Sequence, residues 1–330
     1  MAALAPPVAA IRVAVRRALT GLPETGPVLV ACSGGADSLA LAAATAFVAP
    51  RLGRPAGLVT VDHGLQEGSA ERAEAVAAWA RGTGLAPVEV VRVDVGGRPG
   101  GPEAAAREAR YQALGEVAGR HRAAALLTGH TRDDQAETVL LALARGAGPR
   151  GLAGMPARRD LPGVPLLRPL LDVSREQTRT ACAVLGLDPW EDPHNADPSY
   201  ARSRVRADVL PALVRALGPG VLDNLARTAR LVAADNSALD DLAGVALAEV
   251  RHPDGGLAVP ALAGLAPAVR SRVLHAWARE LGAPPAALSH RHVTALEALV
   301  SGWHGQGAAY LPGGRRVVRR DGRLTAVGPI

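Results

Sequence analysis

The sequence predicts an α/β protein, in which a doubly wound parallel sheet is followed by a smaller, mainly helical domain. In the first half of the chain, apolar runs alternate with helix-forming segments, which is typical of βαβ units with helices on both faces of a sheet. After Pro211 the pattern is helical to about Val300, with a short β-like segment around residues 308–327. The expected strands lie near 28–32, 57–61, 88–93 and 124–128, and the expected helices near 36–48, 69–81, 103–118 and 132–144.

These elements divide the chain into three parts. Residues 1–26 are expected to form an N-terminal helical segment, residues 27–215 the sheet domain, and residues 216–330 the smaller domain. The second boundary rests on residues that interrupt regular structure, namely Pro211, Gly218, Pro219 and Gly220. The stretch from Gly146 to Pro165 contains Pro and Gly and interrupts the alternation, so we expect a mobile or substrate-covering loop there.

A glycine-containing turn follows the first expected strand and carries the strongest chemical signal. Residues 28–41 read VLVACSGGADSLAL, so an apolar strand leads into a turn and then into a helix. Glycines let the backbone approach a ligand closely, and the amides that open the helix attract phosphate. Asp37 is placed to hold the accompanying Mg²⁺. The expected phosphate-binding residues, which we call the phosphate turn, are Ser33, Gly34, Gly35, Ala36, Asp37 and Ser38.

The absence of lysine distinguishes between two kinds of phosphate chemistry. All 37 basic residues are arginines, which excludes the phosphate loop GxxxxGK(S/T). A phosphate turn without a lysine on the γ-phosphate suits a pyrophosphate leaving group, released by attack at the α-phosphate. We therefore expect adenylation rather than phosphoryl transfer.

A group of ionisable residues follows the fourth expected strand. At the helical spacing i, i+3, i+4 and i+7, one face would carry His130, Asp133, Asp134 and Glu137. The buried side is then expected to be formed by Val139, Leu140, Leu141 and Leu143. Because like charges at these spacings repel, we expect a compensating cation, either Mg²⁺, with Asp133 as a ligand, or the ammonium groups of an amino-acid substrate. The alternative is a solvated acidic face.

Three further residues are candidates for the same site. Asp62 and His63 end the second expected strand and could contact nucleotide or metal, although a histidine there could equally be a packed, hydrogen-bonded residue. Arg110 could pair with a phosphate or a substrate carboxylate, because a guanidinium fork suits either, or it could be an ordinary surface arginine.

The positive charge is concentrated in the C-terminal part of the chain. The net charge is +6; residues 1–200 hold 21 arginines and 21 acidic residues, and residues 201–330 hold 16 arginines and 10 acidic residues. A basic surface outside the catalytic domain favours a polyphosphate partner such as RNA, since neutralising phosphates releases counterions. A basic surface that only aids solubility is the alternative. The candidate RNA contacts are Arg315, Arg316, Arg319 and Arg320.

The two cysteines and the hydropathy pattern limit the remaining classes. Cys32 and Cys182 form no CxxC motif, which argues against a zinc site, an iron–sulfur site or a disulfide framework and suits a reducing cytoplasm. No run of 18 apolar residues occurs, and the N-terminus lacks a convincing signal sequence. We expect a cytoplasmic protein without membrane contact.

Several motifs identify a resemblance to a known family. Residues 33–38, SGGADS, match the SGGxDS signature of the PP-loop (N-type) ATP pyrophosphatases. Over about two-thirds of the chain, the further matches resemble the bacterial tRNA(Ile)-lysidine synthetases. These matches are VDHGL at 61–65, EAAAR at 103–107 with Arg110 and Tyr111, GH at 129–130, DDQAET at 133–138, RPL at 168–170, DPHN at 192–195 and RSRVR at 202–206.

The resemblance implies a two-step ligation. ATP, with Mg²⁺, would activate C2 of the wobble cytidine in the CAU-anticodon tRNA(Ile), and free L-lysine would then attack to give lysidine, AMP and pyrophosphate. Arg202 and Arg206 would contact tRNA, and a homodimer is compatible with the family. The catalytic residues it implies are Asp37, Arg110, His130, Asp133, Asp134 and Glu137.

This sequence departs from the family's usual pattern in two features. Three other functional classes also stay open. Ser203 stands where the family usually has Asn, which puts the contact of that residue in doubt. The chain is also short for the family and is expected to lack its additional C-terminal domain. The alternatives are a tRNA-thiolating PP-loop enzyme, for which the cysteine pairs are missing, a small-molecule amide-forming ATP pyrophosphatase, and a non-catalytic nucleotide-binding module.

Overall fold

The computed structural model describes residues 5–62, 64, 68–93, 102–193, 197–285 and 287–328, with the side chains of the helix that begins at residue 102 described from residue 107. The chain divides into two compact units, Met1–Val232 and Ala233–Ile330. A long helix, α10 (Val221–Val250), crosses this division. The boundary expected near residue 215 stays a prediction.

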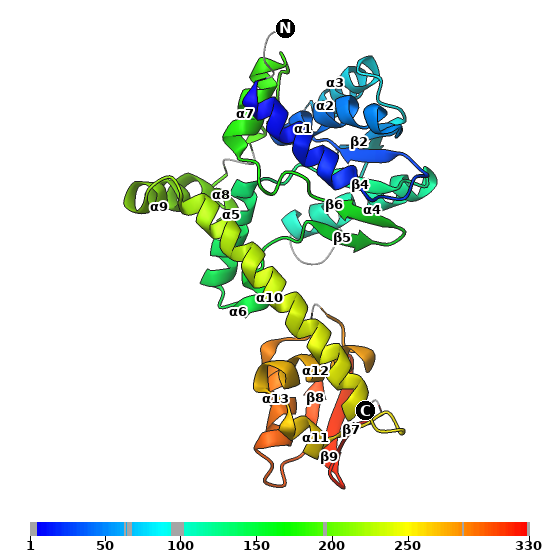
Figure 1. Ribbon diagram of the computed structural model, residues 1–330, viewed down its shortest axis with the longest axis vertical. Coiled ribbons are helices and arrows are strands. Elements are labelled where there is room, and N and C mark those ends of the chain that lie inside the picture. Colours follow the sequence, from blue (N-terminus) through cyan, green and yellow to red (C-terminus); the bar gives the residue numbers. More distant parts are fainter. Residues whose placement is uncertain are drawn as a thin grey trace. The chain divides into compact units, whose positions relative to one another are not determined.

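The first unit contains a six-stranded, mostly parallel sheet (Figure 1), which confirms the predicted fold class. Its spatial order is β3-β2-β1-β4-β6-β5, and only β5 runs antiparallel to its neighbour. The order reverses at β1, which pairs with β2 on one side and with β4 on the other. The strands are β1 (Val28–Ala31), β2 (Ala56–Asp62), β3 (Val88–Arg92), β4 (Ala125–Thr128), β5 (Arg158–Leu161) and β6 (Val164–Leu167).

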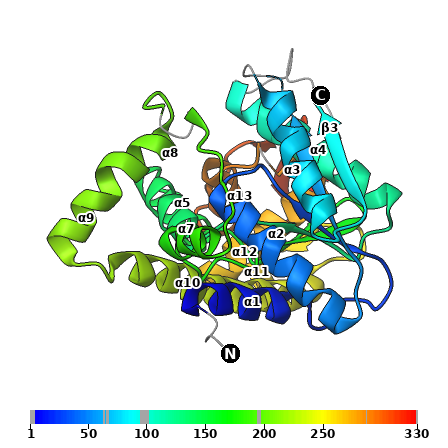
Figure 2. The ribbon, with the colours of Figure 1, turned by 90° about the horizontal axis from the view of Figure 1, so that it is seen from above.

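Helices cover both faces of this sheet because successive strand residues point to opposite sides. Val28 and Val30 of β1 pack against one helical layer, and Leu29 packs against α4 on the other face. Figures 1 and 2 both show α1 alongside α2, and α7 contacts both. The helices of this unit include α1 (Pro6–Leu19), α2 (Ala36–Val48), α3 (Ser69–Gly82), α4 (Pro102–Arg120), α5 (Arg132–Ala144) and α7 (Arg175–Val184).

The stretch from Gly146 to Pro165 is ordered into regular elements, so the predicted loop is wrong. It contains helix α6 (Gly148–Leu152), and β5 and β6 form an antiparallel hairpin around Gly163, whose φ is +79°. Pro and Gly therefore mark the turn of a hairpin here. Further along, the chain forms α8 (Ala201–Arg204), a π-helical turn η3 (Val205–Val209) and α9 (Leu210–Leu217).

The second unit combines helices with a small antiparallel sheet of order β7-β10-β9-β8. Trp277, 1% exposed, lies in its apolar core, and its indole Nε1 donates to the carbonyl of Gly255 at 3.2 Å. The β-like C-terminal segment predicted from the sequence is present, with β7 as an additional short strand. The elements are β7 (Leu257–Ala258), α11 (Val259–Gly264), α12 (Pro267–Glu280), α13 (His290–Ser301), β8 (Ala309–Leu311), β9 (Arg315–Arg320) and β10 (Arg323–Val327). Among the described helices, none has the length and apolar character needed to span a membrane.

Candidate active site

The glycine turn after β1 has the geometry of a phosphate cradle. Gly34 has a φ of +84°, a left-handed conformation that favours glycine, and Gly35 is the N-cap of α2. The Ser38 hydroxyl accepts the Ser33 backbone N–H at 3.2 Å and donates to the Gly35 carbonyl at 2.9 Å. The turn is thus held in shape by its own hydroxyl, and it opens onto the N-terminus of α2, where anions are stabilised.

The ends of β1 and β4 meet at the point where the strand order reverses. Gly129 follows β4, and a Cβ built on it would lie 2.9 Å from the carbonyl carbon and oxygen of Asp37 and 3.0 Å from the Ser38 nitrogen. Only a glycine lets the β4 loop approach α2 so closely. Ligands of open α/β sheets bind at this kind of reversal point, beyond the carboxyl ends of the strands.

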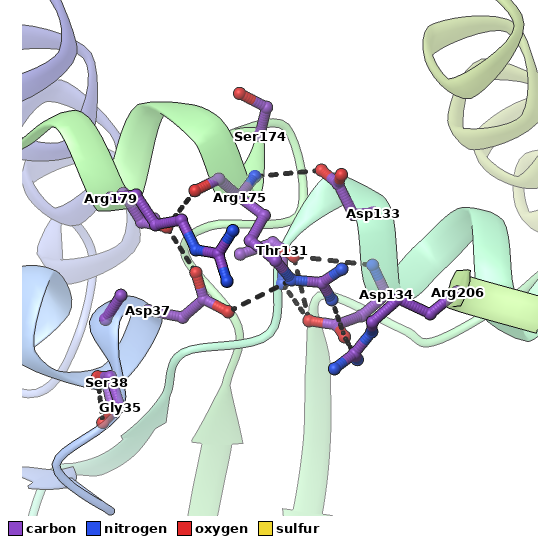
Figure 3. Close-up of polar contacts among 12 residues, drawn as sticks. Gly35, Asp37, Ser38, Thr131, Asp133, Asp134, Ser174, Arg175, Arg179 and Arg206 are labelled. Carbon is purple, nitrogen blue, oxygen red and sulfur yellow. Dashed lines mark hydrogen bonds and ion pairs between the residues drawn. The ribbon is translucent and has the colours of Figure 1, made fainter. Parts of the chain in front are cut away.

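Arg175 connects the carboxylates of this region (Figure 3). It is the first residue of α7, and its backbone N–H donates to Asp133 Oδ2 at 2.9 Å. Its Nη2 lies 2.9 Å from Asp134 Oδ1 and 3.2 Å from Glu137 Oε1, and its Nε lies 3.8 Å from Asp37 Oδ2. Burial lowers the pKa of Arg175, but the nearby carboxylates together raise it by more, so its pKa lies above the ordinary value.

The acidic residues of α5 do converge, although on arginines rather than on a solvated face. The side chain of Glu137 is 0% exposed, and Arg206 Nε approaches its Oε1 at 2.8 Å while Arg202 Nε approaches its Oε2 at 3.1 Å. The compensating cations in this structure are therefore the guanidinium groups of the chain itself. Arg202 and Arg206, expected to contact tRNA, face α5, and Arg202 also donates to Thr138 Oγ1 at 2.7 Å.

Two details of the predicted acidic helix are wrong. His130 precedes the helix, because Thr131 is the N-cap and forms a capping box with Asp134, whose carboxylate accepts the Thr131 N–H at 2.8 Å. Asp134 and Glu137 are buried as well as Val139, whereas Leu140 and Leu141 are half-buried and Leu143 is 60% exposed, so the expected apolar side is only partly the buried one. A Thr-x-x-Asp sequence signals such a cap, so this boundary was readable from the sequence.

Asp37 has an unusual environment for a carboxylate in the first turn of a helix. Burial raises its pKa to about 6, a hydrogen bond from the Thr178 hydroxyl opposes this rise, and Asp134 and Asp133 add to it. Arg175 offsets part of this repulsion, and further positive charge near Asp37 would relieve more of it. Two carboxylates are enough for Mg²⁺ when phosphates and water complete its octahedron. The described residues form no cluster of three or more metal-ligating side chains, so the expectation that Asp37 and Asp133 hold Mg²⁺ stays a prediction.

A second group of charged residues lies beside His130. Three guanidinium carbons, those of Arg107, Arg110 and Arg159, lie 5.2 to 5.8 Å from the centre of the Tyr111 ring. Arg168 is 4% exposed and donates to the Pro156 carbonyl at 2.7 Å. No carboxylate pairs with these four arginines in the part of the chain that the structure describes. We name this group, Arg107, Arg110, Arg159 and Arg168, the Tyr111 arginine cluster.

Burial, helped by the Tyr111 arginine cluster, keeps His130 neutral. The pKa of His130 is lowered to about 4, mainly by burial and further by Arg168 and Arg110, while Asp134 opposes the shift. Its Nδ1 lies 3.0 Å from the Thr128 hydroxyl. Arg110 and His130, chosen separately from the sequence, are thus electrostatically coupled, and an anion bound here would meet several uncompensated positive charges.

The remaining predicted site residues are Asp62, His63 and the arginines of β9. Asp62 is buried and its Oδ1 accepts the Gly64 N–H at 2.9 Å, a contact that shapes its own turn. His63 lies outside the described residues. On β9, Arg315 and Arg320 are exposed, whereas Arg319 donates to the carbonyl of Leu299 at 3.0 Å and so caps the C-terminus of α13.

Three residues of the site were missed by the sequence reasoning: Arg175, Thr178 and Arg168, the last quoted only as part of a motif. Arg175 and Thr178 lie on α7, and Thr178 donates to Asp37 from a position 141 residues away in the chain. The capping box formed by Ser174 and Gln177 marks the start of that helix in the sequence. It does not indicate which helix Arg175 will face.

Comparisons with known proteins identify the family of this chain. Residues 12–213 match the PP-loop domain model, and residues 257–325 match the model of the TilS substrate binding domain. The tRNA(Ile)-lysidine synthase of Salinispora tropica is 82% identical over 329 residues, which cover 100% of this chain and 99% of that protein. The chain belongs to the tRNA(Ile)-lysidine synthase family. It is therefore a ligase that uses ATP.

Other similarities support the same family and fold. The tRNA(Ile)-lysidine synthase of Thermobifida fusca is 57% identical over 97% of both chains. Among solved structures, the U34-tRNA thiolase NcsA of Methanococcus maripaludis aligns with a TM-score of 0.56 at 21% identity, covering 68% of this chain and 80% of that chain. At this identity the likeness shows only that the two proteins share the fold.

Replacing Gly129 by Ala should weaken ATP binding by at least about tenfold, because the added Cβ displaces the start of α2 and with it the phosphate turn. The measurement is ATP affinity by calorimetry. Gly115→Ala, in α4, is the matched control, since no atom lies within 4 Å of the Cβ it would add. Equal affinities in the two variants would show that the close approach does not shape the turn.

Replacing His130 by Gln should make the protein less sensitive to acid. The folded-state pKa of His130, about 4, lies below its unfolded value, so its contribution to stability is present above about pH 6.5 and is lost as the pH falls toward 4. Relative to the variant, the wild type should lose up to about 3 kcal/mol of unfolding free energy across that window. Denaturant unfolding at several pH values measures this, and parallel curves would contradict the burial of a neutral histidine.

Proposed function

We propose that this ligase joins lysine to C2 of the wobble cytidine in the CAU-anticodon tRNA(Ile). In the first step, the C2 carbonyl oxygen of the cytidine attacks the α-phosphate of ATP, and pyrophosphate leaves. In the second, the deprotonated ε-amine of lysine attacks C2, and AMP leaves with that oxygen, giving lysidine. The observation that carries this proposal is a phosphate turn without lysine, placed at the sheet reversal point beside a buried acidic cluster.

The phosphate turn supports the first step. Its geometry exposes helix-opening amides to the triphosphate, and the Tyr111 arginine cluster supplies further positive charge for phosphate oxygens or the adenylated nucleotide. Bound Mg²⁺ would neutralise phosphate charge, with Asp37 and Asp133 as its protein ligands. Rate enhancement would then come from positioning and electrostatics.

The acidic cluster supports the second step. Free lysine carries two ammonium groups, and Asp134 and Glu137 already bind cationic guanidinium groups. The ammonium groups would share or replace those contacts, and either carboxylate could accept the proton that the ε-amine loses. Asp134 also caps α5, so it is held in place by the backbone, whereas the partners of Glu137 among the described residues are arginines.

The tRNA contacts are proposed to lie on both units. In the second unit, Arg315, Arg316 and Arg320 of β9 are available, and Arg316 Nε is buried without a hydrogen-bond partner among the described residues. Arg319 is used as a helix cap and is the weakest candidate of the four. In the first unit, the side chains of Arg202 and Arg206 are each about 30% exposed and are separate candidates for tRNA contact.

Incubation with ATP, radiolabelled lysine and total tRNA tests the function. The expected result is label retained in tRNA(Ile) and released by nuclease digestion as one modified nucleoside, with AMP and pyrophosphate in equal amounts. ADP and phosphate as principal products would reject adenylation. Pyrophosphate release that does not depend on tRNA would instead indicate a small-molecule substrate.

Glu137→Gln should raise the lysine concentration needed for half-maximal rate about ten- to a hundredfold, because it removes a charge-assisted contact. The adenylated tRNA should still form and should accumulate when lysine is scarce. Glu176→Gln, an exposed residue on α7, is the matched control. Since Glu137 also neutralises three arginines, thermal unfolding of both variants separates a loss of folding from a loss of lysine binding.

A different outcome would reassign Glu137. If the first step fails while the variant stays folded, Glu137 serves the nucleotide or its metal rather than lysine. If neither the lysine dependence nor the adenylation rate changes, the cluster has a purely structural role.

A further inference from the structure

A pocket lies among the helices of the first unit, away from the phosphate turn. Its volume is about 430 Å³, and its walls come from α1, α2, α3 and the end of α7. Phe47 lies ten residues along α2 from Asp37, about 15 Å at 1.5 Å per residue. The apolar lining includes Ile11, Trp79, Leu185 and Leu187.

Two guanidinium groups share one aromatic ring in this pocket. The Cζ of Arg12 lies 3.4 Å from the centre of the Phe47 ring, and the Cζ of Arg51 lies 3.5 Å from it. Two planar cations cannot both reach this distance on the same face, so they stack on opposite faces. Each stack is favourable on its own, but the arrangement brings two positive charges together across a single ring.

Nothing in the described part of the chain neutralises this pair. No carboxylate there pairs with Arg12 or Arg51. The Nη1 of Arg51 donates a hydrogen bond to the Phe47 carbonyl at 2.6 Å. The Nε of Arg12 is buried without a hydrogen-bond partner among the described residues. Burial and the nearby Arg51 both lower the pKa of Arg12. An anion in the pocket would relieve the repulsion and accept the unused N–H groups.

We propose that this pocket binds a small organic anion with a flat apolar body, such as an aromatic carboxylate or sulfonate. The anionic group pairs with Arg12 and Arg51, and the body lies against Trp79 and the leucines. A nucleic-acid backbone suits the site less well, because its phosphates carry no apolar surface to fill a pocket lined mainly by Ala, Leu, Ile and Trp side chains. The site is independent of the proposed ligase reaction.

The probe for this site is 8-anilinonaphthalene-1-sulfonate, titrated by fluorescence into the full-length protein. Saturable binding is expected, and Arg12→Gln and Arg51→Gln should each weaken it about tenfold or more, the loss of one charge-assisted contact. Arg16→Gln, an exposed position on the same helix, is the control and should bind as the wild type does. The uncharged N-phenyl-1-naphthylamine should bind more weakly and should be insensitive to both arginine substitutions.

Three results would overturn the proposal. If the sulfonate does not saturate, or if both arginine variants bind it as the wild type does, the pair is only a stacking arrangement on Phe47. If ATP with Mg²⁺ displaces the probe, the probe occupies the phosphate turn. If tRNA displaces it and Arg12→Gln weakens tRNA binding, the arginines contact nucleic acid instead.

Discussion

The buried ion-pair network around Arg175 is the constraint on which the functional region depends. Three carboxylates, from Asp37, Asp134 and Glu137, lie near its guanidinium group, and the Asp133 carboxylate accepts its backbone N–H. The Glu137 side chain has no solvent exposure. Removing charges from water is costly unless they are paired and hydrogen bonded. Arg175, the first residue of α7, therefore links three separate segments. It holds the N-terminal turns of α2 and α5 close to the N-terminus of α7.

The sheet topology explains why these segments meet. The strand order reverses between β1 and β4, so the loops after these two strands diverge to α2 and α5. Gly129 allows the loop after β4 to touch the start of α2, directly beside the phosphate turn. The network thus stabilises the same edge at which the fold offers backbone amides to an anion. Structural stability and the proposed chemistry rest on the same residues.

Local signals made most of this fold predictable from the sequence. Alternating apolar runs gave the strands and helices through β4 and α5, and SGGADS gave the phosphate turn, because both depend on neighbouring residues. The hairpin of β5 and β6 was missed, since its Gly and Pro were interpreted as a loop. Arg175 was missed for a different reason. Its partners on α5 are about 40 residues away in the chain, and single-sequence periodicity carries no information about such convergence.

The burial of Glu137 shows the limit of reasoning from charge alone. Three carboxylates on one helix face suggested a need for an external cation, and the need was real, but the chain meets it with Arg175, Arg202 and Arg206. The sequence contains these arginines without indicating where they fold. A charge imbalance in sequence therefore predicts that compensation exists, and only the tertiary structure identifies the partner.

His130 separates two regions of opposite electrostatic character. On one side the acidic residues of α5 are neutralised by arginines, and on the other the Tyr111 arginine cluster has no carboxylate partner among the described residues. In the proposed reaction, an anionic phosphate can enter the basic side without breaking an internal ion pair, whereas a lysine ammonium must compete with a guanidinium for its carboxylate. The first event is electrostatically easier than the second. If the proposed reaction takes place here, this charge arrangement favours nucleotide and tRNA before lysine, the order that adenylation before amine attack requires.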